Sequence, residues 1–276
     1  MDIGGPLLLV GCGKMGGALL DGWLAQGIAA GSVTLVEPQA ALRARFAAQG
    51  VGAVVAADAL AAELPAELAP AAVVLAIKPQ QIDAALPDYV RFARPGTVFL
   101  SIAAGKTIGN FEAVLGAAAA IVRAMPNTPA AVGRGMTVLC ANGRVSAAQR
   151  EVCGALLAAV GETAWVEDEA LLDPVTAVSG GGPAYVFLLI ECLAEAGVAA
   201  GLPADLAMRL ARVTVAGAGE LVHQAEAPAA TLRENVTSPG GTTLEALKVL
   251  MAPDGLQPLM TRAIAEATRR SRELAS

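Results

Sequence analysis

Short apolar runs alternate with helix-like stretches through the first half of the chain. The runs cover residues 7–10, 33–36, 51–55, 73–77, 98–102, 120–123 and 136–140, and the third is the weakest. Helical patterns from about residue 14 to 26 and from 40 to 49 separate the first of them. Strands that are apolar throughout are typical of a parallel sheet with both faces covered. We therefore predict an α/β fold in which residues 1–164 form a Rossmann-type, doubly wound, mainly parallel sheet.

The second half, residues 165–276, shows only helical patterns. Residues 182–197 are apolar nearly all round, which predicts a helix buried on every side. In the next helix Leu206, Leu210 and Val213 recur at spacings of four and three, and a last helix covers residues 257–271. A small helical domain cannot bury such a central helix alone, so we predict an all-helical oligomerisation and substrate domain in an obligate oligomer.

Composition narrows the class of protein. Apolar residues make up 55% of the 276 residues and charged residues 16%, which excludes a disordered chain. Mean hydropathy is +0.58, but the most lipid-like stretch spans only residues 184–190, against ~20 residues for a bilayer span. A net charge of −6 argues against nucleic acid. No basic region precedes the first apolar run, so we expect a soluble, cytoplasmic protein without a signal peptide and with no nucleic-acid or membrane partner.

Histidine and cysteine restrict the chemistry further. His223 is the sole histidine, so histidine-rich metal sites are excluded, and its place in a helix-like stretch indicates a structural role or a cation at the helix end. Cys12, Cys140, Cys153 and Cys192 lack metal-ligand spacing and have apolar surroundings, so we expect four buried thiols and no metal. Any reaction is therefore expected to depend on a cofactor.

The motif Gly11-x-Gly13-x-x-Gly16 follows the first predicted strand and opens a helix. Glycines there allow a tight turn and let the backbone approach a pyrophosphate at the helix N-terminus. Glu37 ends the second strand, at the distance expected for an acid that hydrogen-bonds a ribose 2′-hydroxyl and repels a 2′-phosphate. Glu37 therefore favours NADH over NADPH.

Two arginines on the following helix, Arg43 and Arg45, could weaken that preference. Two further segments follow strands and should face the cofactor, because ligands bind beyond the carboxyl ends of parallel strands. One contains Lys78-Pro79 and the other is Met-Pro-Asn-Thr-Pro at residues 125–129. The alternatives are a solvated lysine beside a strand end and an ordinary proline loop.

A polar block at residues 235–245 lies in the helical half. Thr242 and Glu245 have capping-box spacing, and Pro239-Gly240-Gly241 frees the backbone to present its N–H groups. The block contains no lysine or arginine, so the anion it suits is small, more like a carboxylate than a phosphate. A plain helix cap is the alternative.

These blocks, with Ser-Gly-Gly-Gly-Pro-Ala-Tyr at residues 179–185, resemble pyrroline-5-carboxylate reductase, a family with the two-domain build of 6-phosphogluconate dehydrogenase. The resemblance runs in order from Gly11 to the C-terminal helices. It implies NAD(P)H-dependent reduction of the cyclic imine 1-pyrroline-5-carboxylate to L-proline, the last step of proline biosynthesis. It also implies a homodimer that assembles further into a ring of dimers, a decamer.

The resemblance implies roles for individual residues. Thr243 would be the hydroxyl nearest the imine nitrogen, with Ser238 as the second catalytic group, and Gly181 stands where the family often has serine. The substrate would contact Ser238, Gly240, Gly241, Thr242, Thr243 and Glu226. The NADPH or NADH cofactor would contact Gly11, Cys12, Gly13, Lys14, Met15, Gly16, Glu37, Ala76, Lys78, Pro79, Ala103, Ala104, Asn127 and Pro129.

Two other functions fit the same architecture. One is a related reductase of another imine or of a β-hydroxyacid. The β-hydroxyacid reaction normally needs a lysine or histidine, and Lys248 is the only lysine of the helical half. The other is a sensor that binds NAD(P)H without catalysis, which would have no need for the carboxylate site.

Overall fold

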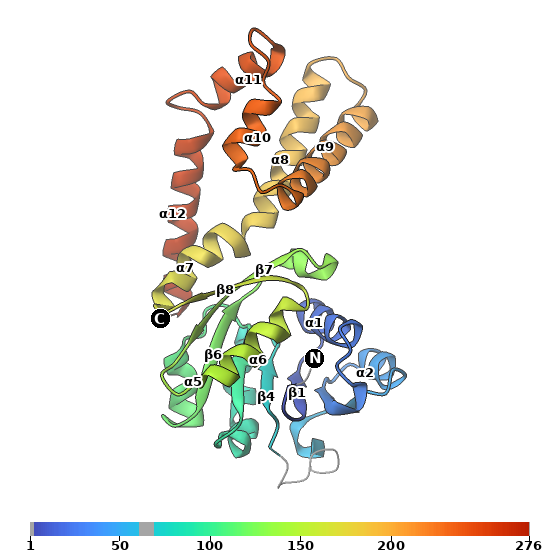
Figure 1. Ribbon diagram of the computed structural model, residues 1–276, viewed down its shortest axis with the longest axis vertical. Helices are drawn as coiled ribbons and strands as arrows, with labels where there is room; N and C mark the ends of the chain where they lie inside the picture. The colour runs from blue at the N-terminus through green and yellow to red at the C-terminus, as the bar shows by residue number, and fades with distance from the viewer. Residues whose placement is uncertain (1–2, 61–68, 276) are drawn as a thin grey trace. The chain divides into compact units, whose positions relative to one another are not determined.

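The chain forms two compact units in the computed structural model, which describes residues 3–60 and 69–275 (Figure 1). We call Met1–Gly180 with Thr268–Ser276 the sheet unit, and Gly181–Ala267 the helical unit. These units are defined by contacts within the chain. The predicted boundary after residue 164 concerns domains that fold independently, and it stays a prediction. Each unit is described separately below.

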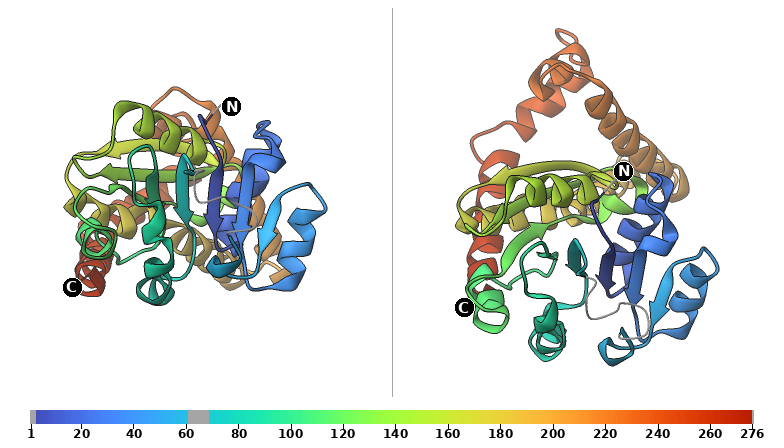
Figure 2. Two further views of the ribbon diagram at one scale, coloured as in Figure 1. Left: turned by 90° about the horizontal axis from the view of Figure 1, so that it is seen from below. Right: turned by 60° about the horizontal axis from the view of Figure 1, so that its bottom comes forward.

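The sheet unit contains an eight-stranded sheet within the described residues, in the order β3-β2-β1-β4-β5-β6-β7-β8 (Figure 2). The strands are β1 Leu7–Val10, β2 Val33–Val36, β3 Gly52–Val54, β4 Ala72–Leu75, β5 Val98–Ser101, β6 Ala120–Met125, β7 Gly135–Ala141 and β8 Gly161–Val166. Neighbouring strands are parallel except β6 and β7. The predicted Rossmann-type sheet is therefore confirmed.

Helices cover both faces of this sheet. They are α1 Lys14–Ala25, α2 Ala40–Ala47, α4 Pro79–Ala85, α5 Ile108–Leu115, α6 Ala147–Ala158 and α7 Leu172–Val175, with short turns η1 Ala30–Ser32, η2 Ala57–Ala59, η3 Leu86–Phe92, η4 Thr128–Val132, η5 Glu169–Leu171 and the π-helix η6 Thr176–Gly180. Leu7 and Leu9 enter one apolar cluster with Trp23, whereas Leu8 enters the other with Phe111. Successive strand residues point to opposite faces, so a sheet buried on both sides needs them all apolar.

The last two strands differ from the sequence-based expectation. β7 runs antiparallel to β6 because the connection, residues 126–134, is too short for the crossover that parallel strands need. β8 was not predicted, because Glu162 and Thr163 interrupt its apolar character and most of its side chains are only half-buried. Propensity alone does not separate such an edge strand from a loop.

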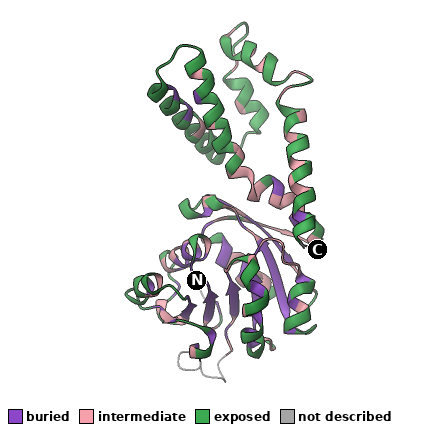
Figure 3. Ribbon diagram, turned by 180° about the vertical axis from the view of Figure 1, so that it is seen from behind, coloured by how far each residue is buried: buried purple, intermediate pink, exposed green. Residues whose placement is uncertain are grey.

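The helical unit consists of α8 Gly182–Ala199, α9 Ala204–Gln224, α10 Ala229–Asn235, α11 Thr242–Leu250 and the first part of α12 Leu256–Ala275. α8 and α9 pack through small residues, with Ala194, Ala207 and Ala211 buried. In the single chain residues 182–197 are not covered on every side (Figure 3), since Phe187 is 60% exposed and Leu188 57% exposed, and their burial by a partner subunit stays a prediction. The two side chains are apolar as expected, but no other part of the described chain covers them.

The exposure of α8 also bears on the expectations that no segment spans a membrane and that all four thiols are buried. Within the described residues, Glu169–Ala199 is the one helical stretch long and apolar enough to cross a membrane by length and composition alone. Cys192 on α8 is exposed, contrary to the prediction of four buried thiols, whereas Cys12, Cys140 and Cys153 are buried and all four are free. An apolar face on α8 is also what a subunit contact requires.

Candidate active site

The predicted cofactor segments follow four neighbouring strands, β1, β4, β5 and β6, at the carboxyl edge of the sheet. Backbone hydrogen bonds continue past the strand ends and hold the segments together. The N–H of Ala76 donates to the carbonyl of Val10 at 2.8 Å, and the N–H of Ile102 donates to that of Leu75 at 3.2 Å. Because β2 and β4 flank β1 on opposite sides, this is the edge at which doubly wound sheets bind ligands.

The glycines of the first turn have different physical reasons. Gly11 has φ +90°, and a Cβ there would lie 2.7 Å from Cγ2 of Ile77. A Cβ on Gly16 would collide with the carbonyl oxygen of Gly11. At Gly13 nothing lies within 4 Å of the Cβ position. Packing therefore requires glycine at two of the positions, and the third leaves bare backbone open to a ligand.

The start of α1 fits an anion. Gly13 is the N-cap of α1, and no side chain caps the first N–H groups. Those groups have no partners within a helix, and the helix dipole favours negative charge beside them. No acidic residue occupies the first turn of α1. The residues present therefore fit a dinucleotide pyrophosphate.

A cavity of about 440 Å³ lies beside this turn, lined by Cys12, Gly13, Lys14, Gly17, Ala18, Asp21, Gln39, Leu42, Arg45 and Ala131. Arg45 donates to both carboxylate oxygens of Asp21, at 2.8 and 2.7 Å. Arg43 instead donates to the main-chain carbonyl of Glu37 at 2.7 Å. The two arginines that could weaken the NADH preference are therefore both held by partners within the chain.

Glu37 is 3% exposed and lies against the glycine-rich turn. Its Oε2 accepts a hydrogen bond from the N–H of Cys12 at 2.7 Å, and its Oε1 accepts one from the N–H of Gln39 at 2.9 Å. Burial, with a smaller contribution from the Glu37 carboxylate, raises the pKa of the Cys12 thiol to about 12. Cys12 therefore keeps a neutral side chain, and its N–H group is already paired with Glu37.

The predicted cofactor residues after β4 and β5 are mostly small, apart from Lys78 and Pro79. Ala76 lies against Gly16, so the turn and the end of β4 are in close contact. Lys78 is exposed at the N-cap of α4, and Pro79 is the first helical residue. Ala103 is buried and its N–H donates to Oγ of Ser101 at 3.2 Å, whereas Ala104 is half-buried. The structure thus brings these predicted residues to the same edge.

Asn127 joins two of the motifs. Its Oδ1 accepts a hydrogen bond from the N–H of Met136 at 2.9 Å, and its Nδ2 donates to Oγ of Ser179 at 3.2 Å. Ser179 lies in the π-helix η6, a geometry found frequently at functional sites. Pro129 lies in η4, directly after Asn127. Ser179 was not a predicted site residue, although its segment carried the family resemblance.

The substrate block lies in the helical unit at the start of α11. The predicted capping box of Thr242 and Glu245 is wrong, because Gly241 is the N-cap and Thr242 is already the first helical residue. Glu245 contacts Lys248 at 2.7 Å instead. No side chain caps the helix, so its first N–H groups stay available to a ligand.

The hydroxyl groups of the block are exposed. Gly240 has φ +71°, which turns the chain so that the N–H of Gly241 donates to the carbonyl of Ser238 at 3.0 Å. Within the described residues, no hydrogen bond uses the hydroxyls of Ser238, Thr242 or Thr243. Glu226 is exposed in the loop between α9 and α10, and His223 lies in the last turn of α9. The block thus offers amide and hydroxyl donors to a small anion.

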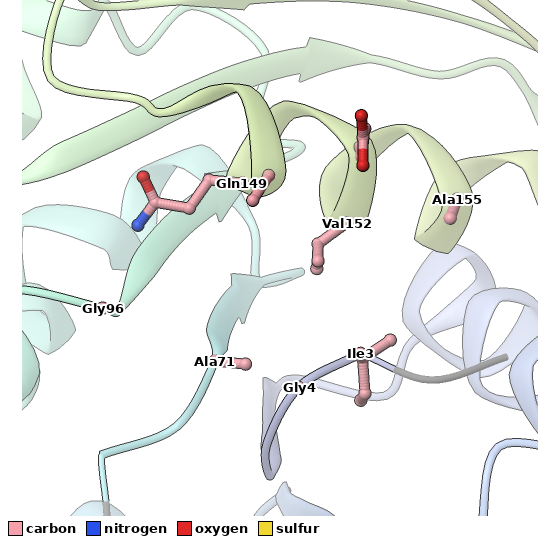
Figure 4. A pocket seen from close by; sticks show the side chains of 9 residues that line it. Ile3, Gly4, Ala71, Gly96, Gln149, Val152 and Ala155 are labelled. Atoms are coloured by element: carbon pink, nitrogen blue, oxygen red, sulfur yellow. The ribbon is translucent and has the colours of Figure 1, made fainter.

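The opposite edge of the sheet carries a different cavity. It has a volume of about 490 Å³ and is lined by residues that include Gly4, Ala71 and Gly96, which precede β1, β4 and β5, and Gln149 and Val152 of α6 (Figure 4). The cavity lies at the amino ends of the strands and holds none of the predicted site residues. In the described part of the chain, no group of three His, Cys, Asp or Glu side chains is placed to hold a metal ion.

Comparisons with known proteins identify the family. The family model for pyrroline-5-carboxylate reductase dimerisation matches residues 169–274, and that for NADP oxidoreductase, coenzyme F420-dependent, matches residues 7–105. A pyrroline-5-carboxylate reductase from Pseudomonas aeruginosa is 40% identical over 269 residues, covering 98% of this chain and 96% of the relative. The chain belongs to the pyrroline-5-carboxylate reductase family.

Solved structures of the family agree with this assignment. A pyrroline-5-carboxylate reductase from Coxiella burnetii has a TM-score of 0.91 at 34% identity, covering 99% of both chains. The Plasmodium falciparum pyrroline carboxylate reductase with NADP bound has a TM-score of 0.81 at 28% identity, covering 100% of both chains. Membership in the reductase family makes the chain an oxidoreductase with a nicotinamide cofactor, and the dimerisation match supports a homodimer.

Proposed function

We propose that the chain reduces 1-pyrroline-5-carboxylate to L-proline, with NADH or NADPH as the hydride donor. The observation that carries this proposal is the similarity to pyrroline-5-carboxylate reductases over nearly the whole chain. The similarity includes both the carboxyl edge of the sheet, with the uncapped start of α1, and the uncapped start of α11. The reaction would be the last step of proline biosynthesis.

The substrate carboxylate would bind at the N-terminus of α11. The N–H groups of Gly240, Thr242 and Thr243 and the Ser238 hydroxyl are the donors available, whereas the N–H of Gly241 already donates to Ser238 and its backbone would only line the site. The Thr243 hydroxyl would lie nearest the imine nitrogen, with Ser238 as the second contact. Glu226 is the remaining proposed substrate residue.

The chain's own task in this chemistry is orientation. A bound nicotinamide supplies the hydride. A protonated cyclic imine is already an electrophile, and hydride addition to its carbon leaves a neutral secondary amine, so no strong general acid is needed. Alignment of two bound reactants can be worth ~7–11 kcal/mol of the barrier. Amide and hydroxyl donors suffice for that task.

The coenzyme would be held at the carboxyl edge of the sheet. The pyrophosphate would lie on the turn before α1, and the nicotinamide beside the small residues that follow β5 and the motif that follows β6. The residues proposed for the coenzyme are Gly11, Cys12, Gly13, Lys14, Met15, Gly16, Glu37, Ala76, Lys78, Pro79, Ala103, Ala104, Asn127 and Pro129.

We further propose that Glu37 favours NADH over NADPH, because a carboxylate at the end of β2 repels a 2′-phosphate. Glu37→Ser should then raise the NADPH-to-NADH ratio of kcat/KM by about tenfold, the effect of one unit charge at a few ångströms in a partly solvated site. An unchanged ratio would remove the Glu37 charge from coenzyme choice.

The family resemblance and the composition support two further proposals, on the assembly and on the location of the protein. We propose that the homodimer assembles into a ring of dimers, a decamer, through the exposed apolar side chains of the helical unit. We also propose a cytoplasmic location. Light scattering coupled to size exclusion would give the mass of the assembly, and a plain dimer would contradict the ring.

The initial rate of coenzyme oxidation with 1-pyrroline-5-carboxylate tests the central proposal. NADH and NADPH are compared at matched concentrations, and a robust rate with either supports the reaction. Coenzyme binding without any rate would favour one of the two alternatives, a related imine or β-hydroxyacid reductase or a non-catalytic NAD(P)-binding sensor. A panel of other cyclic imines, and of β-hydroxyacids with the oxidised coenzyme, would then separate those two.

A further inference from the structure

The carboxylate of Glu37 accepts hydrogen bonds from two turns that are far apart in sequence. Its partners are the N–H of Cys12 at 2.7 Å and the N–H of Gln39 at 2.9 Å. Cys12 lies between β1 and α1, whereas Gln39 is the N-cap of α2. Neither helix has a side-chain cap of its own. A single buried side chain therefore links the turn before α1 to the N-cap of α2.

These contacts fix the turn that would bind the pyrophosphate. The N–H of Gly11 donates to the carbonyl of Val36 at 2.8 Å, and the next N–H, that of Cys12, donates to the Glu37 side chain. Two successive N–H groups are thus paired with Val36 and Glu37, at the end of β2, and neither is left to bind a ligand. The groups that follow, from Gly13 onward, belong to the uncapped start of α1. The orientation of that start depends on the two anchored groups before it.

The main chain of Glu37 is held as firmly as its side chain. Its N–H donates to the carbonyl of Val54 at 3.0 Å, and its carbonyl accepts the Arg43 guanidinium at 2.7 Å. Its side chain is nearly inaccessible to solvent. A carboxylate fixed in this way can hold the glycine-rich turn before any coenzyme is present, which lowers the ordering cost of binding.

We propose that Glu37 is a positioning residue for the pyrophosphate-binding turn, acting on NADH and NADPH alike, in addition to any effect of its charge on the ribose. The proposal rests on the coenzyme site of the proposed function. The two roles are compatible, because each carboxylate oxygen can accept a second hydrogen bond. They are separable, because positioning changes affinity for both coenzymes while charge changes the ratio between them.

Two variants separate these roles. Glu37→Asp keeps the charge but shortens the side chain by one methylene group, so its carboxylate cannot reach both N–H groups. The dissociation constants for NADH and NADPH should both rise about tenfold, with their ratio within twofold of wild type. Glu37→Gln keeps the length and removes the charge, so the ratio should shift towards NADPH.

The measurement is isothermal titration calorimetry at 25 °C on the whole assembled protein, with NADH, NADPH and ADP-ribose as probes. ADP-ribose lacks nicotinamide, so its affinity should also fall about tenfold in Glu37→Asp. In Glu37→Asp the KM for the coenzyme should rise much more than kcat falls, a split that a general structural defect would not produce. Glu151→Asp, the same change on an exposed residue of α6 at the distant cavity, is the matched control.

Each outcome decides the proposal. Wild-type affinities of Glu37→Asp for all three probes would overturn positioning. A changed ratio without a common loss would also overturn it and leave a ribose contact alone. Should Glu37→Asp fail to fold, the ADP-ribose affinity of Glu37→Gln decides, since loss of one of the two contacts should still weaken binding. Binding involves no imine, so a failure of the proposed reduction would appear separately as absent turnover with intact coenzyme affinity.

Discussion

The side-chain amide of Asn127 donates a hydrogen bond to the hydroxyl of Ser179 at 3.2 Å, across 52 positions of sequence. The contact joins the proline-flanked motif after β6 to the π-helix that precedes α8. The other end of the same amide accepts the N–H of Met136. One polar side chain therefore ties together three segments at the carboxyl edge of the sheet.

Replacement of Asn127 should destabilise the protein. Asn127→Leu leaves the N–H of Met136 and the hydroxyl of Ser179 without their partner, and the free energy of unfolding should fall by about 1–3 kcal/mol. Urea denaturation at fixed protein concentration measures the change, with Thr128→Ala at the exposed neighbouring position as control. Equal stability of the two variants would contradict the structural role of Asn127.

Thr243→Ala tests the substrate block. Loss of the exposed hydroxyl at the start of α11 should lower kcat/KM for the imine by about tenfold or more, as expected for a lost polar contact at the reacting group. The dissociation constant for the coenzyme should not change. The comparison variant is Thr261→Ala, also on the helical unit but within α12. A comparable loss of coenzyme affinity in Thr243→Ala would place this residue in the nucleotide site instead.

A charge on α8 should dissociate the assembly. Phe187 is exposed in the single chain, and Phe187→Glu puts a carboxylate where a partner subunit must supply apolar cover. Light scattering should then give a mass near the 27.6 kDa of one chain. Val114→Glu, the same kind of change on α5 of the sheet unit, should leave the oligomer intact. Retention of the oligomer in Phe187→Glu would exclude this face of α8 from the interface.

Alkaline pH should destabilise the protein through Cys153. Burial raises the pKa of this thiol from 9.0 to about 12. Above pH 9 the unfolded chain releases the proton more readily than the folded chain, so stability is full below pH 9 and falls as pH rises towards 12.

The contribution amounts to about 2 kcal/mol between pH 9 and 10.5. Cys153→Ala removes it, so its unfolding free energy should decline less steeply over this interval in urea titrations. Parallel pH profiles for the two proteins would show that burial of Cys153 does not control the alkaline limb.

The sequence predicts most of the sheet because its central strands are apolar at every position. Leu7–Val10 and Val98–Ser101 need no tertiary information to be recognised as buried strands. Gly161–Val166 does, because its place at the sheet edge is decided by pairing with β7. Likewise, the spacing of residues 182–197 indicates an apolar helix and leaves open which chain covers it.

In the candidate site, too, the sequence predicts the residues and their positions but not their hydrogen-bond partners. Spacing placed Glu37 at the correct strand end, but its two hydrogen-bond partners depend on how the turns before α1 and α2 approach each other. The spacing of Thr242 and Glu245 satisfies a capping box, yet the backbone starts the helix so that Gly241 is the N-cap. Residue types therefore indicate which chemistry is present, whereas the donors and acceptors actually paired follow from tertiary structure.

The path of the chain makes the helical unit an insertion. The last turns of α12 return to the sheet unit, where the Ser271 hydroxyl donates to Oδ1 of Asp173 at 2.7 Å and the backbone of Leu274 lies against Gly105. A cut after residue 180 would thus remove part of the sheet unit together with the helices. A chimaera that exchanges the helical unit between relatives therefore needs two junctions, one at Gly180–Gly181 and one at Ala267–Thr268.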